Sequence, residues 1–267
     1  MRLAADAWTA AECCRVATTR GRLDRGPLMS SDVDVQRGPG TDAPGRTDLW
    51  MVGGLLTVLF TAFHPSGNED NHQVIFAKYA ASDAWVAVHL GQFIGVLLAL
   101  GGLLALHRIL RASDQRSLLA DLAAGTTVAT AAIWAVLQGL DGVALKQAVD
   151  AWNSASGSEE PLRFATAETV RWLEWGFQSY FRVLLGLAFV LTGVALLTGR
   201  LVAGWLGWLA MLAGLCSAAI GIDVGYSGLA SRPQDVLSLA FLVVALTFAV
   251  GLLVSGVRER GRHRSRT

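Results

Sequence analysis

The sequence predicts an all-α fold, an integral membrane six-helix bundle with a disordered N-terminal tail. Composition is the first reason, because 53% of the 267 residues are hydrophobic and only 16% are charged, whereas soluble domains carry about 25% charged residues. The second reason is that six long apolar segments follow residue 48, and none contains a proline. In lipid each backbone amide must be satisfied within its own segment, so these segments are expected to be helices. The third is that the alternating segments of about ten residues that build a membrane β-barrel do not occur.

The predicted elements follow one another along the chain. Residues 1–48 are polar, rich in Arg, Asp and Gly and without apolar periodicity, which predicts a disordered cytoplasmic tail. A span needs about 20 mostly apolar residues, and the predicted spans are 49–63, which is short, 84–106, 118–145, 172–198, 201–226 and 236–257. Residues 258–267 form a basic cytoplasmic tail. Glycines four residues apart in the second and fifth spans predict that helices pack closely there.

The placement of Lys and Arg predicts the orientation in the cell membrane, because cytoplasmic loops are enriched in these residues. If the N-terminus is cytoplasmic, the inner side carries Arg37, Arg46, Arg108, Arg111, Arg116, Arg200, Arg258, Arg260, Arg262, Arg264 and Arg266. The outer side then carries Lys78, Lys146, Arg163, Arg171 and Arg232. This asymmetry favours cytoplasmic N- and C-termini. The formal net charge of +1 indicates no nucleic-acid partner, so the bilayer is the expected partner, and protein partners cannot be predicted.

A polar stripe on the fourth span marks where a function would lie. Arg171, Glu174, Gln178 and Arg182 are spaced by three, four and four residues, which places them on one side of a helix. At 1.5 Å per residue, the Cα of Arg182 lies about 16 Å below that of Arg171. A buried guanidinium keeps its proton and needs a partner. Acidic groups from neighbouring spans are the expected partners, either at position 141 or at position 223.

The other polar residues of the spans also fall in the predicted outer half. The candidate ligand-binding residues are His64, His89, Gln92, Gln138, Asp141, Glu174, Gln178, Arg182, Asp223 and Tyr226. One interpretation is a structural bridge between helices, with Arg171 and Glu174 solvated at the interface. The other is an outward-facing cavity that binds a small ion or polar solute, since polar side chains inside a membrane usually line the bundle interior.

Enzymatic chemistry is the alternative, although no glycine-rich nucleotide loop, GxSxG or HExxH motif occurs. We predict no cofactor. The histidines that would serve for a metal are His64, His72 and His89, with acidic oxygens at positions 69, 70 and 141. His64 and His89 could instead bind a haem iron. A third possibility is an accessory membrane subunit whose buried charges serve assembly.

Overall fold

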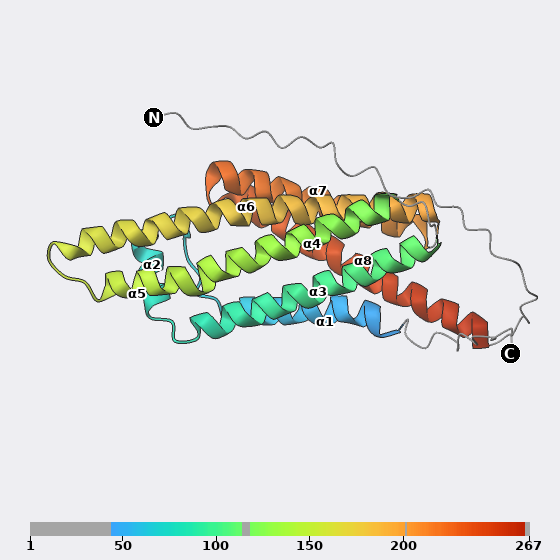
Figure 1. Cartoon of the computed structure of the whole chain (residues 1–267), viewed down its shortest axis with the longest axis horizontal. Coiled ribbons are helices and arrows are strands. Elements are labelled where there is room, and N and C mark those ends of the chain that lie inside the picture. The colour runs from blue at the N-terminus through green and yellow to red at the C-terminus, as the bar shows by residue number, and fades with distance from the viewer. Residues whose placement is uncertain (1–43, 114–117, 201, 265–267) are drawn as a thin grey trace, which may run out of the picture. The chain divides into compact units, whose positions relative to one another are not determined.

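The computed structural model describes residues 44–113, 118–200 and 202–264, and every regular element among them is helical (Figure 1). The helices are α1 (Pro44–Thr61), α2 (His72–Ala80), α3 (Trp85–Ser113), α4 (Leu118–Gly139), the π-helix η1 (Leu140–Leu145), α5 (Lys146–Asn153), α6 (Glu159–Gly199), α7 (Gly204–Ser227) and α8 (Arg232–Arg264). The all-helical prediction is therefore confirmed for the described residues. The predicted disordered tail, 1–48, lies outside them except for its last five residues, where α1 begins.

Five stretches of the described chain are long and apolar enough to cross a membrane. They are Trp85–Ala112, Leu118–Asn153, Glu159–Gly199, Gly204–Ser227 and Arg232–Ser255. The apolar part of α1, Leu49–Thr61, is shorter, and its 13 residues extend over only about 20 Å, against a hydrocarbon core of about 30 Å. The chain thus has the composition of a multi-pass helical membrane protein, but the predicted number of six spans is not confirmed.

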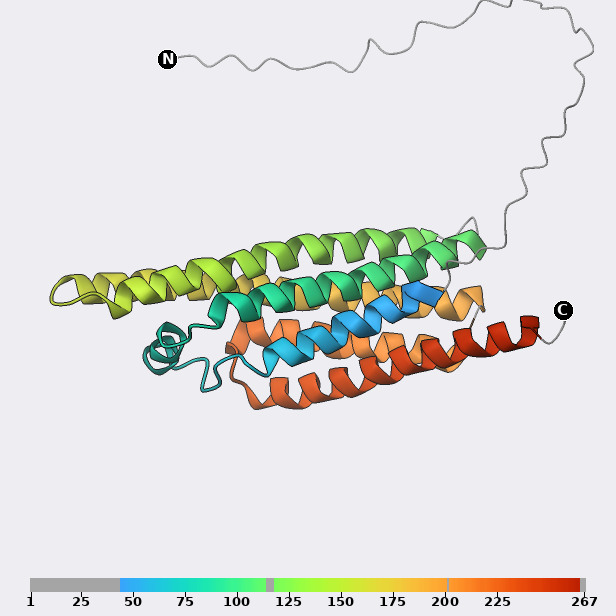
Figure 2. The same cartoon turned by 90° about the horizontal axis from the view of Figure 1, so that it is seen from below.

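The segments predicted as outer loops are largely helical. α2 and α5 lie within them, and α6 begins at Glu159 instead of at residue 172. The 41 residues of α6 extend over about 62 Å, which is twice the thickness of the hydrocarbon core. α5 and the start of α6 therefore reach past the ends of α1 and α3, with α2 beside them (Figures 1 and 2). We call α2, α5 and residues 159–170 of α6 the headpiece.

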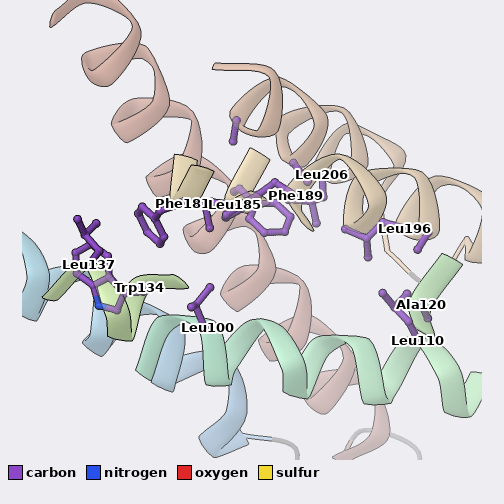
Figure 3. Packing of buried hydrophobic residues seen from close by; sticks show 14 residues of the cluster. Leu100, Leu110, Ala120, Trp134, Leu137, Phe181, Leu185, Phe189, Leu196 and Leu206 are labelled. Atoms are coloured by element: carbon purple, nitrogen blue, oxygen red, sulfur yellow. The ribbon is translucent and has the colours of Figure 1, made fainter. Parts of the chain in front are cut away.

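The headpiece and the bundle have separate hydrophobic cores. The headpiece core consists of Ile75, Phe76, Tyr79, Trp85, Leu145, Val149 and Ala167. The bundle core is larger and combines residues of α3, α4, α6, α7 and α8, several of which are shown in Figure 3. There, the rings of Trp134 on α4 and Phe181 on α6 pack with their centroids 4.6 Å apart. A cluster of buried apolar side chains such as the headpiece core allows a short helix to fold outside a bilayer.

Glycine allows the helices of the bundle to pack closely, as the spacing predicted. A Cβ added at Gly91 or Gly95 of α3 would lie 2.3 Å from the ring of Phe60 or 2.5 Å from Oγ1 of Thr57, both on α1. At Gly221 of α7 it would lie 2.6 Å from a carbonyl oxygen of α6. These distances are shorter than van der Waals contact, so no other residue fits without moving a helix.

Candidate functional site

Three sequence-predicted residues meet where the headpiece joins the bundle. His64 lies just after α1, His89 lies in the first turns of α3, and Asp141 lies in η1. One nitrogen of each imidazole and one carboxylate oxygen lie within 4.8 Å of one another. His89 is 2% exposed, whereas His64 and Asp141 are partly exposed, so the group of donors is accessible from one side. We call these residues the triad.

The π-helix η1 positions the acidic member of the triad. A π-helical turn inside an α-helix is rare and often occurs at functional sites, because it displaces one residue from the regular helical register. Two contacts hold this turn against α3. Nε1 of Trp85 donates a hydrogen bond to the backbone oxygen of Asp141 at 3.1 Å. Gly142 allows the close approach, since a Cβ there would lie 2.7 Å from Cβ of His89.

Each histidine of the triad has one nitrogen at a backbone carbonyl. Nδ1 of His89 lies 2.8 Å from the oxygen of Trp85, and Nδ1 of His64 lies 3.0 Å from that of Pro65. A carbonyl oxygen only accepts, so we assign the proton of each neutral imidazole to Nδ1. The lone pair is then on Nε2. Metal-binding histidines are typically oriented by a hydrogen bond of this kind.

This assignment leaves two hydrogen-bond acceptors facing each other. Nε2 of His89 lies 3.0 Å from Oδ2 of Asp141, and neither atom carries a proton when the imidazole is neutral and the carboxyl group ionised. The other carboxylate oxygen, Oδ1, is buried without a hydrogen-bond partner. The arrangement therefore calls for a positive charge between the side chains, either an additional proton or a metal ion.

Trp85 packs against both histidines. Its ring centroid lies 5.0 Å from that of His64 and 4.3 Å from that of His89, and the two imidazoles are 5.2 Å apart. Tyr79 covers the other part of the indole at 4.2 Å. The indole therefore packs against both imidazoles and helps to fix the orientation of their rings.

A buried arginine connects the loop that carries His64 to α6. Nη1 of Arg171 donates to Oε2 of Glu174 at 2.6 Å, and Nη2 donates to Oε2 of Glu69 at 2.5 Å. The hydroxyl group of Tyr79 donates to the same oxygen of Glu69. Arg171 is 2% exposed and Glu174 4%, so neither is solvated, in contrast to one interpretation of the sequence. This network holds the segment between α1 and α2 in place.

Burial sets the protonation states of two groups in this segment. It lowers the pKa of His64 below 6.5, although the negative charge of Asp141 opposes the shift. The imidazole is therefore neutral at pH 7 and its lone pair is available. Burial also raises the pKa of the Tyr79 hydroxyl above its usual value of 10.0, so this group stays protonated and donates to Glu69.

The remaining candidates of the outer half make no hydrogen bond to the triad among the described residues. Nε2 of Gln92 donates to Oγ1 of Thr61 at 3.0 Å. Gln138 is buried two residues before η1, and its Oε1 has no hydrogen-bond partner. Gln178 is half-buried on α6. Nδ1 of His72 lies 2.9 Å from Oε1 of Glu168, and this histidine is not part of the metal-compatible group found among the described residues.

The candidates on α7 do not join the triad. Asp223 accepts hydrogen bonds from Ser231 and, at 3.0 Å, from Nε2 of Gln234, so it closes the turn between α7 and α8. Tyr226 is 90% exposed. Arg182 pairs with neither of its expected partners among the described residues, and its guanidinium lies over the ring of Phe241.

Two residues of this region, Tyr79 and Trp85, were not among the sequence candidates. Glu69 was expected only as an oxygen ligand of a metal, and Arg171 only as part of the polar stripe on the fourth span. A tyrosine and a tryptophan at the ends of spans are typical of membrane interfaces, which conceals their role beside the triad. Glu69 lies in the segment HPSGNEDNH, and the density of polar residues there was the available signal.

Comparisons of the chain with protein-family models, with curated proteins and with solved structures found no match.

Proposed function

We propose that this multi-pass membrane protein binds one divalent transition-metal ion at its outer end, through His64, His89 and Asp141. The observation that carries the proposal is the convergence of two imidazoles and one carboxylate within 4.8 Å, from three separate segments of the chain. Imidazole nitrogen and carboxylate oxygen are the donors that zinc, iron and related divalent ions take from proteins. A divalent metal would therefore be the small ion for which the sequence predicts a site.

The distances in the triad support this proposal. Two ligands bound at about 2.1 Å lie about 3.0 Å apart at right angles and about 3.4 Å apart in a tetrahedral site, and Nε2 of His89 lies 3.0 Å from Oδ2 of Asp141. A ligand nitrogen of His64 lies within 4.8 Å of these two atoms, so binding would require its ring to move toward them. Three protein ligands leave at least one position for water or another ligand, which is typical of catalytic sites and not of closed structural ones.

The charges near the triad also favour a cation. Glu69 and Glu174 share the single positive charge of Arg171, and Asp141 adds a third carboxylate near that guanidinium. A divalent ion bound between His89 and Asp141 would replace the missing proton there and add positive charge beside these carboxylates.

We also propose a membrane topology of six spans with both termini in the cytoplasm. With the apolar part of α1 as a sixth, short span, the start of α1 and the end of α8 lie at one end of the bundle, opposite the headpiece (Figure 2). The asymmetry of Lys and Arg then favours cytoplasmic N- and C-termini. In this orientation the triad lies at the outer membrane interface, where ions reach it from water.

Metal titration of the purified protein tests the proposal. We expect the chelator-treated protein to bind one Co²⁺ or Zn²⁺ per chain, measured by calorimetry and by elemental analysis after dialysis. His89→Ala and His64→Ala should each weaken binding at least tenfold, since each removes a ligand. His72→Ala is the matched control, because His72 lies in the headpiece outside the triad, and it should bind as the wild type does. Equal binding by all four proteins, or none by the wild type, would refute the proposal.

A further inference from the structure

Arg182 of α6 has a charge without a counter-ion in the described part of the chain. Its guanidinium contacts α8 through Phe241, with Cζ 5.9 Å from the ring centroid. Nε is buried and has no hydrogen-bond partner. None of the ion pairs among the described residues includes this side chain.

The acidic groups of the neighbouring helices are engaged elsewhere. Asp141 faces His89 at 3.0 Å. Asp223 accepts hydrogen bonds from Ser231 and Gln234 at the turn between α7 and α8. Glu174, two turns above on α6, binds Arg171 at 2.6 Å. Among the described residues, no carboxylate forms an ion pair with Arg182.

The backbone of Arg182 is held in place against α7. Oγ of Ser217 donates to the carbonyl oxygen of Arg182 at 2.8 Å, and a Cβ added at Gly221 would lie 2.9 Å from Cβ of Arg182. α6 therefore cannot rotate to bring the guanidinium to the headgroups. Phe241 lies nine residues into α8, about 14 Å along its axis from Arg232, so this contact lies well inside the spanning segment.

A guanidinium keeps its charge when it is buried, and an unpaired charge is costly in hydrocarbon. Nε is the one atom of this group that is both enclosed and without a partner. The side chain as a whole is only partly buried, so its terminal Nη atoms are accessible to a ligand. The planar fork that they form matches the two oxygens of a carboxylate or phosphate group.

We propose that Arg182 anchors an oxyanion site on the spanning helices, whose ligand presents a carboxylate or phosphate group to the accessible Nη atoms where α6 contacts α8. An anionic lipid or a free anion can supply this group. The site is independent of the metal proposal, because it rests on the unpaired arginine and shares no residue with the triad.

Two variants of the intact protein test the site. Arg182→Gln removes the fork. Phe241→Glu adds a carboxylate at the side chain that already contacts the guanidinium, so this variant should fold and displace the external oxyanion. Val243→Thr is the control, because Val243 lies two residues further on α8 and is 55% exposed.

Native mass spectrometry counts the lipids that each protein retains. Thermal shifts of delipidated samples then measure the binding of four added ligands, which are oleate, phosphatidylglycerol, phosphatidylcholine and inorganic phosphate. The wild type and Val243→Thr should bind an oxyanion at least about tenfold more tightly than the two variants. Binding of oleate or phosphatidylglycerol without binding of phosphate identifies a lipid as the source, and binding of phosphate identifies a free anion. If the wild type binds none of these oxyanions, or if Phe241→Glu binds them equally well, the proposal is wrong. The comparison of Phe241→Glu with the wild type tests the proposal even if Arg182→Gln does not fold.

Discussion

Replacing Arg171 by methionine should destabilise the protein strongly. The change removes the only positive charge between Glu69 and Glu174, whose side chains are 22% and 5% exposed, and leaves two carboxylates facing each other. Breaking a buried ion pair from one side costs about 3–5 kcal/mol. For a protein of this size, each kcal/mol lowers the melting temperature by about 2–4 °C. The expected decrease is therefore about 6–20 °C, measured in detergent by tryptophan fluorescence.

An exposed ion pair supplies the control for this experiment. Arg111 and Asp121 are joined at 3.0 Å, but their side chains are 66% and 49% exposed, and such pairs contribute about 0–1 kcal/mol. Arg111→Met should therefore melt near the wild-type temperature. Adding Glu69→Gln and Glu174→Gln to Arg171→Met should restore much of the loss, because the repulsion disappears. If Arg171→Met melts within 2 °C of Arg111→Met, the network does not hold the headpiece segment as we describe.

Three further predictions follow from local contacts. Gly142→Ala places a methyl group 2.7 Å from Cβ of the triad histidine in α3. Metal titration should therefore show weaker binding, and thermal unfolding should show that the folded state loses about 1–3 kcal/mol of stability. Gly139→Ala is the control, because a Cβ there has nothing within 4 Å, and it should change neither metal binding nor stability. Gly214→Ala brings a Cβ within 2.5 Å of a carbonyl oxygen of α6 and should lower the melting temperature, whereas Gly176→Ala, which faces open space, should not. Burial lowers the pKa of His64 below 6.5, so the unfolded chain binds more protons than the folded one just below that pH. The stability of the metal-free protein should therefore decrease as the pH falls through about 6.5, and His64→Asn should reduce this slope in pH-dependent melting curves.

The helical class and five of the long helices were predictable because lipid imposes a simple rule on sequence. A run of apolar residues without proline must satisfy its backbone internally, and this rule needs no knowledge of tertiary contacts. The headpiece was not predictable in the same way. Its short helices are stabilised by packing on one another, as Phe76 packs on Phe164 with centroids 5.8 Å apart, and such helices are marginal alone.

The sequence predicted how far along each helix the candidate residues lie, but not toward which neighbouring helix their side chains point. The positions of the predicted spans placed His89, Asp141 and Glu174 in the outer half of the bundle. How each helix is rotated about its axis depends on packing. The π-helix η1 adds a local change of helical register, and no residue pattern predicts it. This is why Arg182 was expected to meet Asp141 or Asp223, whereas it lies over Phe241.

X-ray absorption spectroscopy of the Zn²⁺-loaded protein tests the central claim most directly, because it identifies the atoms bound to the ion. The proposed triad predicts two imidazole nitrogens at about 2.0–2.1 Å and a carboxylate oxygen at about 2.0–2.2 Å, with the imidazole signal halved in His89→Ala. A shell of oxygen atoms without imidazole scattering, or a spectrum unchanged in that variant, would contradict the claim that His64, His89 and Asp141 hold a metal.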